Sequence, residues 1–264
     1  MSPFGRGQRV LAVLAACVAL AAPCTARAES LQVAPIRVDF APADQTQVLW
    51  LSNTGDGPLH AQVRVFAWSQ ANGKDDLAPT HDVIASPPMV SIAPHGRQLV
   101  RLVRLAGPQP PAAAGAEQSY RLLVNEVPTA DSKPVTSGLH FLLQYSVPVF
   151  LTTQAAATAA TAPPAAVDTS HLLVRLHRLP GGHANLTVSN SGVTHIKISD
   201  LSLLDGHGNQ HMLVPGLVGY VLAGETMSWP VDLLPTQSIG DARITARFND
   251  ETHAQPLHVV DPDD

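Results

Sequence analysis

Cysteine is almost missing from this chain of 264 residues, because only Cys17 and Cys24 are present. Both lie in the first 28 residues, which have the pattern of a cleaved export signal. The exported chain should therefore contain no disulfide and no reactive thiol. The sequence also has no Gly-x-Ser-x-Gly motif, phosphate-binding glycine loop or dinucleotide-binding fingerprint. These absences predict a protein that is not an enzyme, has no catalytic residues and needs no cofactor.

Basic residues are also scarce. Removal of the first 28 residues takes away three of the 16 basic residues and none of the 21 acidic ones, and three lysines remain, at Lys74, Lys133 and Lys197. An acidic chain of this kind is a poor partner for nucleic acid. The apolar run at 10–22 is too short for a membrane-spanning helix, and no later segment is long and uniform enough for one. We therefore expect neither nucleic-acid binding nor membrane insertion.

The N-terminal segment is typical of a secretory signal peptide. Arg6 and Arg9 precede the apolar run at 10–22, and Ala26-Arg27-Ala28 ends it with small residues. We predict cleavage after Ala28. A competing lipoprotein cleavage at Cys17 is disfavoured, because it would cut the apolar run in half.

Alternating apolar and polar residues predict short β-strands along the rest of the chain. The first series lies at 31–40, 47–51, 60–68, 89–92, 97–105, 119–127 and 139–151, and the second at 171–179, 184–189, 196–204, 220–222, 227–231 and 242–248. No convincing helix separates the strands, and this spacing is typical of β-sandwiches. Turns at Asn53-Thr54-Gly55 and Asn190-Ser191-Gly192 occupy similar places in the two series, which indicates related topologies.

The predicted fold is therefore all-β, with two tandem immunoglobulin-like sandwiches after the signal. Residues 155–167 consist almost only of alanine, threonine and proline and are expected to form a linker. A helix there is disfavoured by Thr158, Thr161, Pro163 and Pro164. The predicted boundaries are 1–28 for the signal, 29–154 for the first domain, 155–167 for the linker and 168–264 for the second domain. Trp50, Trp68 and Trp229 are expected to fill the sandwich cores.

The strand at 139–151 is unusual because its odd positions are all apolar. One face would carry Leu139, Phe141, Leu143, Tyr145 and Val147. Pro148 removes an amide donor, which is tolerated mainly on edge strands, and an apolar edge strand invites pairing with another chain. The pattern predicts a strand lent to a partner. The alternative is that the odd side chains face their own core, a position we expect instead for Leu142 and Phe150.

In this order and spacing, the sequence resembles the periplasmic pilus-assembly chaperones of the usher pathway, which have two immunoglobulin-like domains. The resemblance is carried by Pro35-Ile36-Arg37-Val38, Leu51-Ser52-Asn53, Ser86-Pro87-Pro88, Tyr120-Arg121-Leu122, Glu126-Val127-Pro128, the 139–151 strand and residues 219–224. It implies two domains set at an angle, a periplasmic location, and partners that are pilus or fimbrial subunits and an outer-membrane usher. The chaperone would complete an unfinished subunit with its strand, using Leu139, Phe141 and Leu143, with Tyr145 and Val147 extending the contact.

The resemblance also implies a carboxylate anchor. Members of the family hold the subunit's terminal carboxylate with two basic residues in the cleft between their domains. Arg37 matches the first, but Pro148 stands where the second, a lysine, is expected. We predict that another arginine compensates, and favour Arg121, because a guanidinium binds a carboxylate bidentately. The alternative for Arg121 is a snorkelling or salt-bridged side chain near Glu117 or Glu126.

Two further interpretations have less support in the sequence. His207 and His211 are four residues apart, but they lie in a turn without a third ligand, so no metal site is predicted.

An exported immunoglobulin-like adhesin or pilus component is the alternative function. It would have a donor extension before its first strand, whereas strand pattern here begins almost at once. An apolar edge strand would also allow a self-capping homodimer when no subunit is bound.

Overall fold

The computed structural model describes residues 31–105, 115–128, 142–159, 167–204, 209–233, 243–257 and 259. The predicted signal peptide, Leu139, Phe141 and His207 lie outside the described residues, as does most of the predicted linker.

The first domain is a sandwich of two β-sheets, and in several of its strands every second side chain is buried. In β9 (Gln118–Glu126), the side chains at 118, 120, 122 and 124 are buried, as expected for a strand with one face on a core. The smaller sheet has the order β1 (Leu31–Ala34), β3 (Thr46–Asn53), β8 (Arg97–Arg104), β6 (Val83–Ser86). The larger has the order β2 (Val38–Phe40), β10 (Gln144–Leu151), β9, β4 (Leu59–Ala71), β5 (Lys74–Pro79), and β7 (Met89–Ile92) also pairs with β4.

The second domain is another two-sheet sandwich. One sheet has the order β11 (Leu172–Arg178), β12 (His183–Asn190), β15 (Thr226–Asp232), and the other has the order β14 (Gln210–Val221), β13 (Ile196–Leu204), β16 (Arg243–Phe248), β17 (Gln255–Leu257). Each domain has its own cluster of buried apolar side chains, and each fully buried leucine or phenylalanine stabilises it by about 1.5–3 kcal/mol. The prediction of an all-β chain with two tandem sandwiches is confirmed.

A buried asparagine makes the same hydrogen bonds in both domains. The amide of Asn53 donates to the carbonyls of Gly57, Ile92 and Ala93, and its oxygen accepts from the amide of Gly55. Asn190 repeats this arrangement with the carbonyls of Thr194, Val221 and Leu222 and the amide of Gly192. The similar turns noted in the sequence therefore have the same structural cause.

The start of the predicted linker is a short helix, α2 (Gln154–Ala159), so the expectation of no helix there is wrong. The hydroxyl oxygen of Thr153 accepts from the amide of Ala156 at 3.1 Å and caps the helix. Ala156 is buried. Pro163 and Pro164 lie beyond the end of α2 and do not oppose it.

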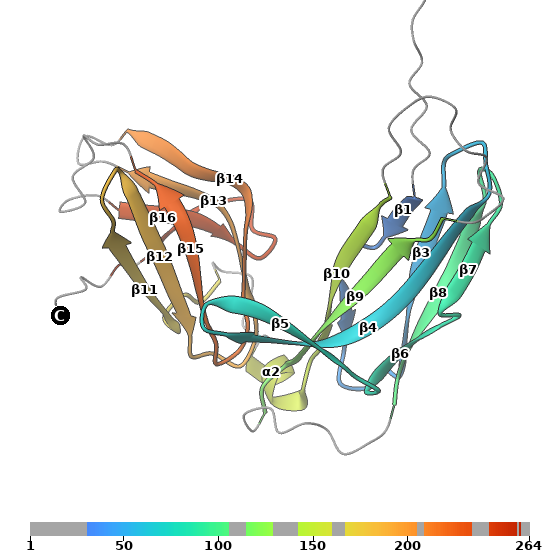
Figure 1. Cartoon of the computed structure of the whole chain (residues 1–264). Helices are drawn as coiled ribbons and strands as arrows, with labels where there is room; N and C mark the ends of the chain where they lie inside the picture. Colours follow the sequence, from blue (N-terminus) through green and yellow to red (C-terminus); the bar gives the residue numbers. More distant parts are fainter. Residues whose placement is uncertain are drawn as a thin grey trace, which may run out of the picture.

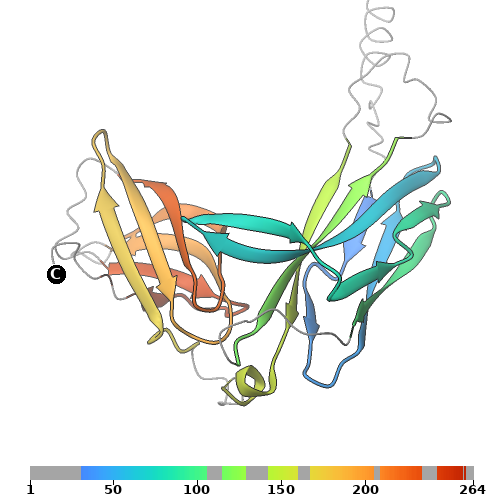
Figure 2. The same ribbon diagram turned by 60° about the horizontal axis from the view of Figure 1, so that its bottom comes forward.

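The two sandwiches are inclined to each other, and a hairpin of the first domain extends to the second (Figures 1 and 2). β4 is 13 residues long, and its C-terminal part and β5 form this hairpin. Asn72 and Gly73 at the tip have φ angles of 53° and 72°, which suits a tight two-residue turn. Gly73 forms a β-bridge with Met227 in β15. A Cβ atom at Gly73 would lie 3.2 Å from the Cβ of Ser228, so the turn also depends on glycine for close approach.

A third apolar cluster joins the domains. It contains Trp68 and Phe150 from the first domain and Tyr220 and Leu222 from the second, all buried. Trp68 therefore does not fill a sandwich core as expected, whereas Trp229 packs partly against the second core. Gln70 adds backbone-like hydrogen bonds, because its side chain donates to the carbonyl of Tyr220 and accepts from the amide of Leu222, both at 2.9 Å.

A polar pair made by the half-buried His195 and the buried Glu117 extends this contact. The ring of His195 in the second domain stacks on Phe150 with the ring centroids 3.5 Å apart. The same histidine has its Nδ1 atom 2.7 Å from a carboxylate oxygen of Glu117 in the first domain. These contacts fix how the side chains of the two domains face each other beside β10.

Replacement of Asn53 or Asn190 by alanine should destabilise the corresponding domain by on the order of 2 kcal/mol, because buried carbonyls lose their donor. Urea unfolding of each variant measures this loss. Asn185→Ala, at a half-buried position of β12, is the matched control and should change the free energy of unfolding by less than about 0.5 kcal/mol. Equal stability of all three variants would contradict this role.

Candidate functional site

The candidate site is the side of β10 that faces away from β9. β10 pairs with β9 along its whole length, from Gln144 to Leu151. On its other side it pairs in parallel with β2, but only over Val149, Phe150 and Leu151. In the described part of the chain, no strand pairs with this side of residues 144–148. The first half of β10 is therefore an edge and the second half is not.

The direction of the backbone groups follows from the register. The amide of Glu126 in β9 donates to the carbonyl of Leu143 at 2.9 Å. Because bonding directions alternate in an antiparallel pair, the odd residues of β10 bond to β9 and the even residues point their backbone groups outward. Pro148 is an even residue, so its missing N–H takes nothing from the pairing with β9. The edge offers the N–H groups of Gln144 and Ser146.

The prediction that the even positions Leu142 and Phe150 face the core of the first domain does not hold. Leu142 is 51% exposed, so the expectation that it faces the core is wrong. Phe150 is buried as expected, but between the domains rather than in the first sandwich.

The described odd residues face the first core. Leu143 and Tyr145 are half-buried against it, and Val147 is 3% exposed. The hydroxyl of Tyr145 donates to the carbonyl of Leu31 in β1. Val147 thus has a place in its own core, and a partner contact by its side chain stays a prediction. Leu143 keeps part of its surface accessible at the end of the strand.

Arg37 lies immediately before β2, which pairs with the second half of β10. The chain crosses from the smaller sheet, where β1 ends at Ala34, to the larger sheet, where β2 begins at Val38. The guanidinium Nε of Arg37 donates to Asp39 at 2.8 Å, and Nη1 donates to Asp250 of the second domain at 2.9 Å. Burial would lower the pKa of Arg37, but Asp39 and Asp250 raise it above its usual value. The side chain is 32% exposed, so it can also meet a ligand.

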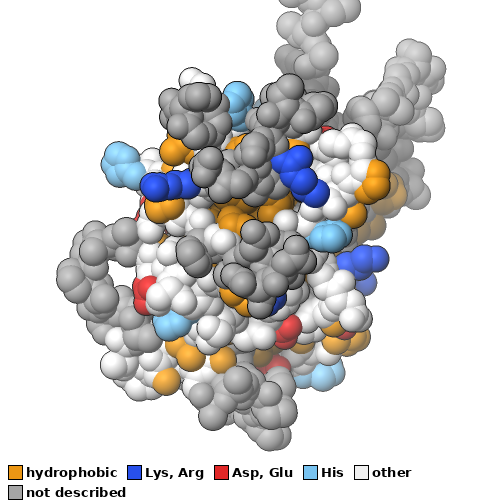
Figure 3. All heavy atoms as spheres, turned by 90° about the vertical axis from the view of Figure 1, so that its left-hand side faces the viewer, with side chains coloured by type: hydrophobic (Ala, Val, Ile, Leu, Met, Phe, Trp, Pro, Cys, Tyr) orange, Lys and Arg blue, Asp and Glu red, His pale blue; other side chains and the backbone are white. Residues whose placement is uncertain are grey.

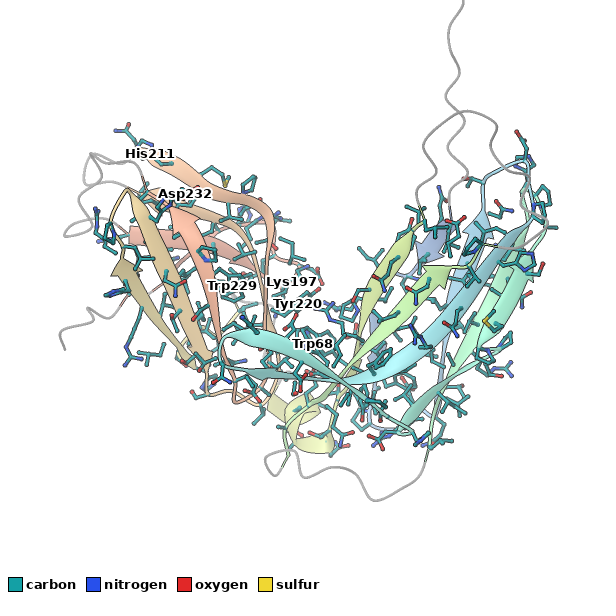
Figure 4. All side chains as sticks on the ribbon, viewed as in Figure 1. Trp68, Lys197, His211, Tyr220, Trp229 and Asp232 are labelled. Atoms are coloured by element: carbon teal, nitrogen blue, oxygen red, sulfur yellow. The ribbon has the colours of Figure 1, made fainter. Side chains whose placement is uncertain are left out.

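Asp250 and Lys197 are part of the site, and the sequence analysis missed them. The Nζ of Lys197 donates to the carboxylate of Asp250 at 2.5 Å. In the view of Figure 4, Lys197 lies with Tyr220 and Trp68 between the two domains. Lys197 and Asp250 are 53 residues apart and belong to the second domain, whereas Arg37 belongs to the first. The sequence therefore has no local pattern that joins these residues, and its only signal was the rarity of lysine.

Arg121 lies deeper, in the contact between the domains. Its Cζ atom is 3.6 Å from the centroid of the Trp68 ring and 5.4 Å from that of Tyr220. Its side chain is 14% exposed, and its Nη2 lies 4.0 Å from Asp75. Burial lowers the pKa of Arg121, and the charge of Asp75 opposes this shift.

The two glutamates proposed as neighbours of Arg121 make other contacts. Glu117 meets His195, and Glu126 accepts from the amide of Leu143. The guanidinium of Arg121 is already held by stacking on Trp68. Its role as a carboxylate anchor stays a prediction.

Other surfaces offer less to a ligand. The outer side of the second domain mixes apolar, basic, acidic and histidine side chains (Figure 3), and His211 lies at the end of that domain away from the first (Figure 4). Among the described residues, no three histidine, cysteine, aspartate or glutamate side chains come together as metal ligands. No helix in the described ranges is both long enough and apolar enough to cross a membrane.

Comparison with known proteins gives a family match for the first domain. Residues 30–155 match the family described as "Pili and flagellar-assembly chaperone, PapD N-terminal domain". No curated protein sequence matches the chain.

Several solved structures share the fold through both domains. A chain of the CsuC–CsuE chaperone–tip adhesion subunit pre-assembly complex from the archaic chaperone-usher Csu pili of Acinetobacter baumannii is 24% identical, with a TM-score of 0.61 over 88% of this chain and 99% of that one. A chain of the Salmonella enterica SafA pilin–SafB chaperone complex is 18% identical, with a TM-score of 0.58 over 88% and 97%. The Pseudomonas aeruginosa CupB2 chaperone is 18% identical, with a TM-score of 0.54 over 86% and 98%.

The family match covers the whole first domain, including β10 and Arg37. The shared fold continues through the second domain. The first domain of this chain therefore belongs to the family of the N-terminal domain of pilus-assembly chaperones.

Proposed function

We propose that this protein is a periplasmic chaperone that binds pilus or fimbrial subunits by adding a β-strand to them, without catalysing a reaction. The observation that supports this most is the half-covered β10, whose residues 144–148 lack a described neighbour on one side. An incomplete subunit would gain backbone hydrogen bonds from that edge. Two of the matched structures are complexes of a chaperone with a subunit, which agrees with this proposal.

The position of β2 suggests how a partner strand would lie. β2 runs parallel to β10 and begins beside Val149. A partner strand beside residues 144–148 would lie in line with β2. If it runs in the same direction, its C-terminal end reaches the beginning of β2, where Arg37 is placed. This arrangement sets the register, because a terminal carboxylate would meet the guanidinium of Arg37.

The apolar side chains would supply most of the affinity. We assign insertion into the partner to Leu139, Phe141 and Leu143, and each such side chain is worth about 1.5–3 kcal/mol when fully buried. Tyr145 and Val147 continue the same face into the first domain's own core. The partner's core and the chaperone's core would then be continuous along one face of the strand.

The later steps of the pathway belong to the same proposal. The subunit would be passed to an outer-membrane usher, which would exchange the chaperone strand for another one. Without a subunit, the edge of β10 could pair with the same edge of a second copy. A self-capping homodimer of this kind would protect the apolar residues until a subunit arrives.

The double variant Leu139→Glu/Phe141→Glu should lose the subunit complex, because two charges cannot enter an apolar groove. Co-expression with a subunit from the same gene cluster, followed by affinity purification, measures the yield of complex. Leu142→Glu is the matched control, since Leu142 is exposed and the sequence pattern puts it on the other face of the predicted 139–151 strand, and it should keep the complex. Equal yields from the double variant and the control would contradict strand insertion.

Arg37→Ala should weaken subunit binding by about 10- to 100-fold, since a hydrogen bond to a charged group contributes about 1.5–3 kcal/mol. The dissociation constant of the purified complex measures the effect. Arg175→Ala removes an exposed arginine from β11 of the second domain and serves as the control. Wild-type affinity in the Arg37 variant would remove this residue from the mechanism.

A further inference from the structure

Both oxygens of the Asp250 carboxylate are used by cations, and each cation comes from a different domain. Oδ2 accepts from Nη1 of Arg37 in the first domain at 2.9 Å, and Oδ1 accepts from Nζ of Lys197 in the second domain at 2.5 Å. Two cations can hold the carboxylate of a peptide C-terminus in the same way, through charge-assisted hydrogen bonds. Here, a carboxylate of the protein itself takes that position.

The second domain holds Lys197 and Asp250 in place through its backbone. The amide of Lys197 donates to the side-chain oxygen of Asn249 at 3.0 Å, and the amide of Asn249 donates to the carbonyl of Lys197 at 2.9 Å. Asn249 has a φ angle of 48°, a conformation that asparagine tolerates better than most residues. The amide of Glu251 closes the turn onto the carbonyl of Phe248. The geometry of this pair is therefore built into the end of β16.

Arg37, Lys197 and Asp250 differ in how far their side chains are exposed to solvent. Lys197 is 20% exposed and Arg37 is 32% exposed, whereas Asp250 is 67% exposed. The cations have already lost much of their water, but the carboxylate can return to solvent at little cost. The hydrogen bond from Lys197 and the nearby charge of Arg37 hold the pKa of Asp250 below its usual value, so it is charged at neutral pH.

We propose that Asp250 is a resident competitor for the carboxylate anchor, and that Lys197 is the second cation of this anchor in place of the lysine that Pro148 replaces. This inference rests on the proposed function. The C-terminal carboxylate of a subunit strand would displace Asp250 and bind Arg37 and Lys197 together. One carboxylate replaces another, so the exchange leaves no cation without a partner. The anchor then spans both domains.

Arg121 is a weaker candidate for this role, because its guanidinium lies over the Trp68 ring and its side chain is 14% exposed. A contrasting interpretation of Asp250 is that it only clamps the domains together. The two interpretations predict opposite effects when its charge is removed. A competitor weakens ligand binding while present, whereas a clamp supports it.

Two peptides test the proposal on the exported chain, residues 29–264. The first is a dye-labelled ten-residue peptide of alternating valine and threonine with a free C-terminal carboxylate, and the second is the same peptide with a C-terminal amide. Fluorescence anisotropy gives the dissociation constant of each. Wild-type protein should prefer the free acid by about 10-fold or more. Equal binding of acid and amide would overturn the carboxylate anchor but leave strand addition intact. Binding of neither peptide would contradict the proposed function, and the inference with it.

The variants separate the roles of the two residues. Lys197→Met should weaken binding of the acid by about 10-fold and leave the amide unchanged. Asp250→Asn should strengthen binding of the acid by about fivefold and also leave the amide unchanged, because the competitor is lost.

Two controls remove equal charges elsewhere on the second domain. Arg175→Met and Asp232→Asn should bind both peptides like wild type, since both residues are exposed. Thermal unfolding checks that every variant is folded. An unchanged ratio of acid to amide binding in Lys197→Met would overturn the role of Lys197. Weaker binding of both peptides to Asp250→Asn would identify Asp250 as a clamp and overturn its role as a competitor.

Discussion

The short parallel pairing between β2 and β10 is the constraint on which the proposed function depends. Because β2 covers only Val149–Leu151, the outward backbone groups of Gln144 and Ser146 have no described strand beside them. The same crossing of the chain between the two sheets places Arg37 where that uncovered edge ends. An edge and a charge at its end therefore have one structural origin, and together they suit a strand with a terminal carboxylate.

The contact between the domains places residues of the second domain beside this site. Trp68, Phe150 and Tyr220 form an apolar cluster, and Gln70 adds hydrogen bonds of the kind that a neighbouring strand would make. These contacts bring Asp250 within hydrogen-bonding distance of Arg37. Charged groups that are far apart in the sequence become one site because buried aromatic side chains hold the domains in position. Affinity for a partner would then depend on the angle between the domains as well as on β10.

Much of the fold could be predicted because a period of two is visible within single strands, as in β9, where the side chains at 118, 120, 122 and 124 are buried. The edge character of β10 also followed from Pro148. The environment of the even positions could not be predicted, because Phe150 is buried against side chains of the second domain, whereas Leu142 is exposed. Helix α2 was missed although its cap, Thr153, is local in the sequence, because the burial of Ala156 that supports this short helix is a tertiary effect. Lys197 and Asp250 were missed because no local pattern links them to Arg37.

Amide hydrogen exchange at Gln144 and Ser146 tests the central claim most directly. In the isolated monomer, these N–H groups should exchange quickly, whereas those of Tyr145 and Val147, which face β9, should be protected. In a complex with a subunit, the amides of Gln144 and Ser146 should become protected by at least about 100-fold, since they would be paired with the partner strand. A stable complex in which these two amides exchange as fast as in the free protein would contradict strand addition at β10.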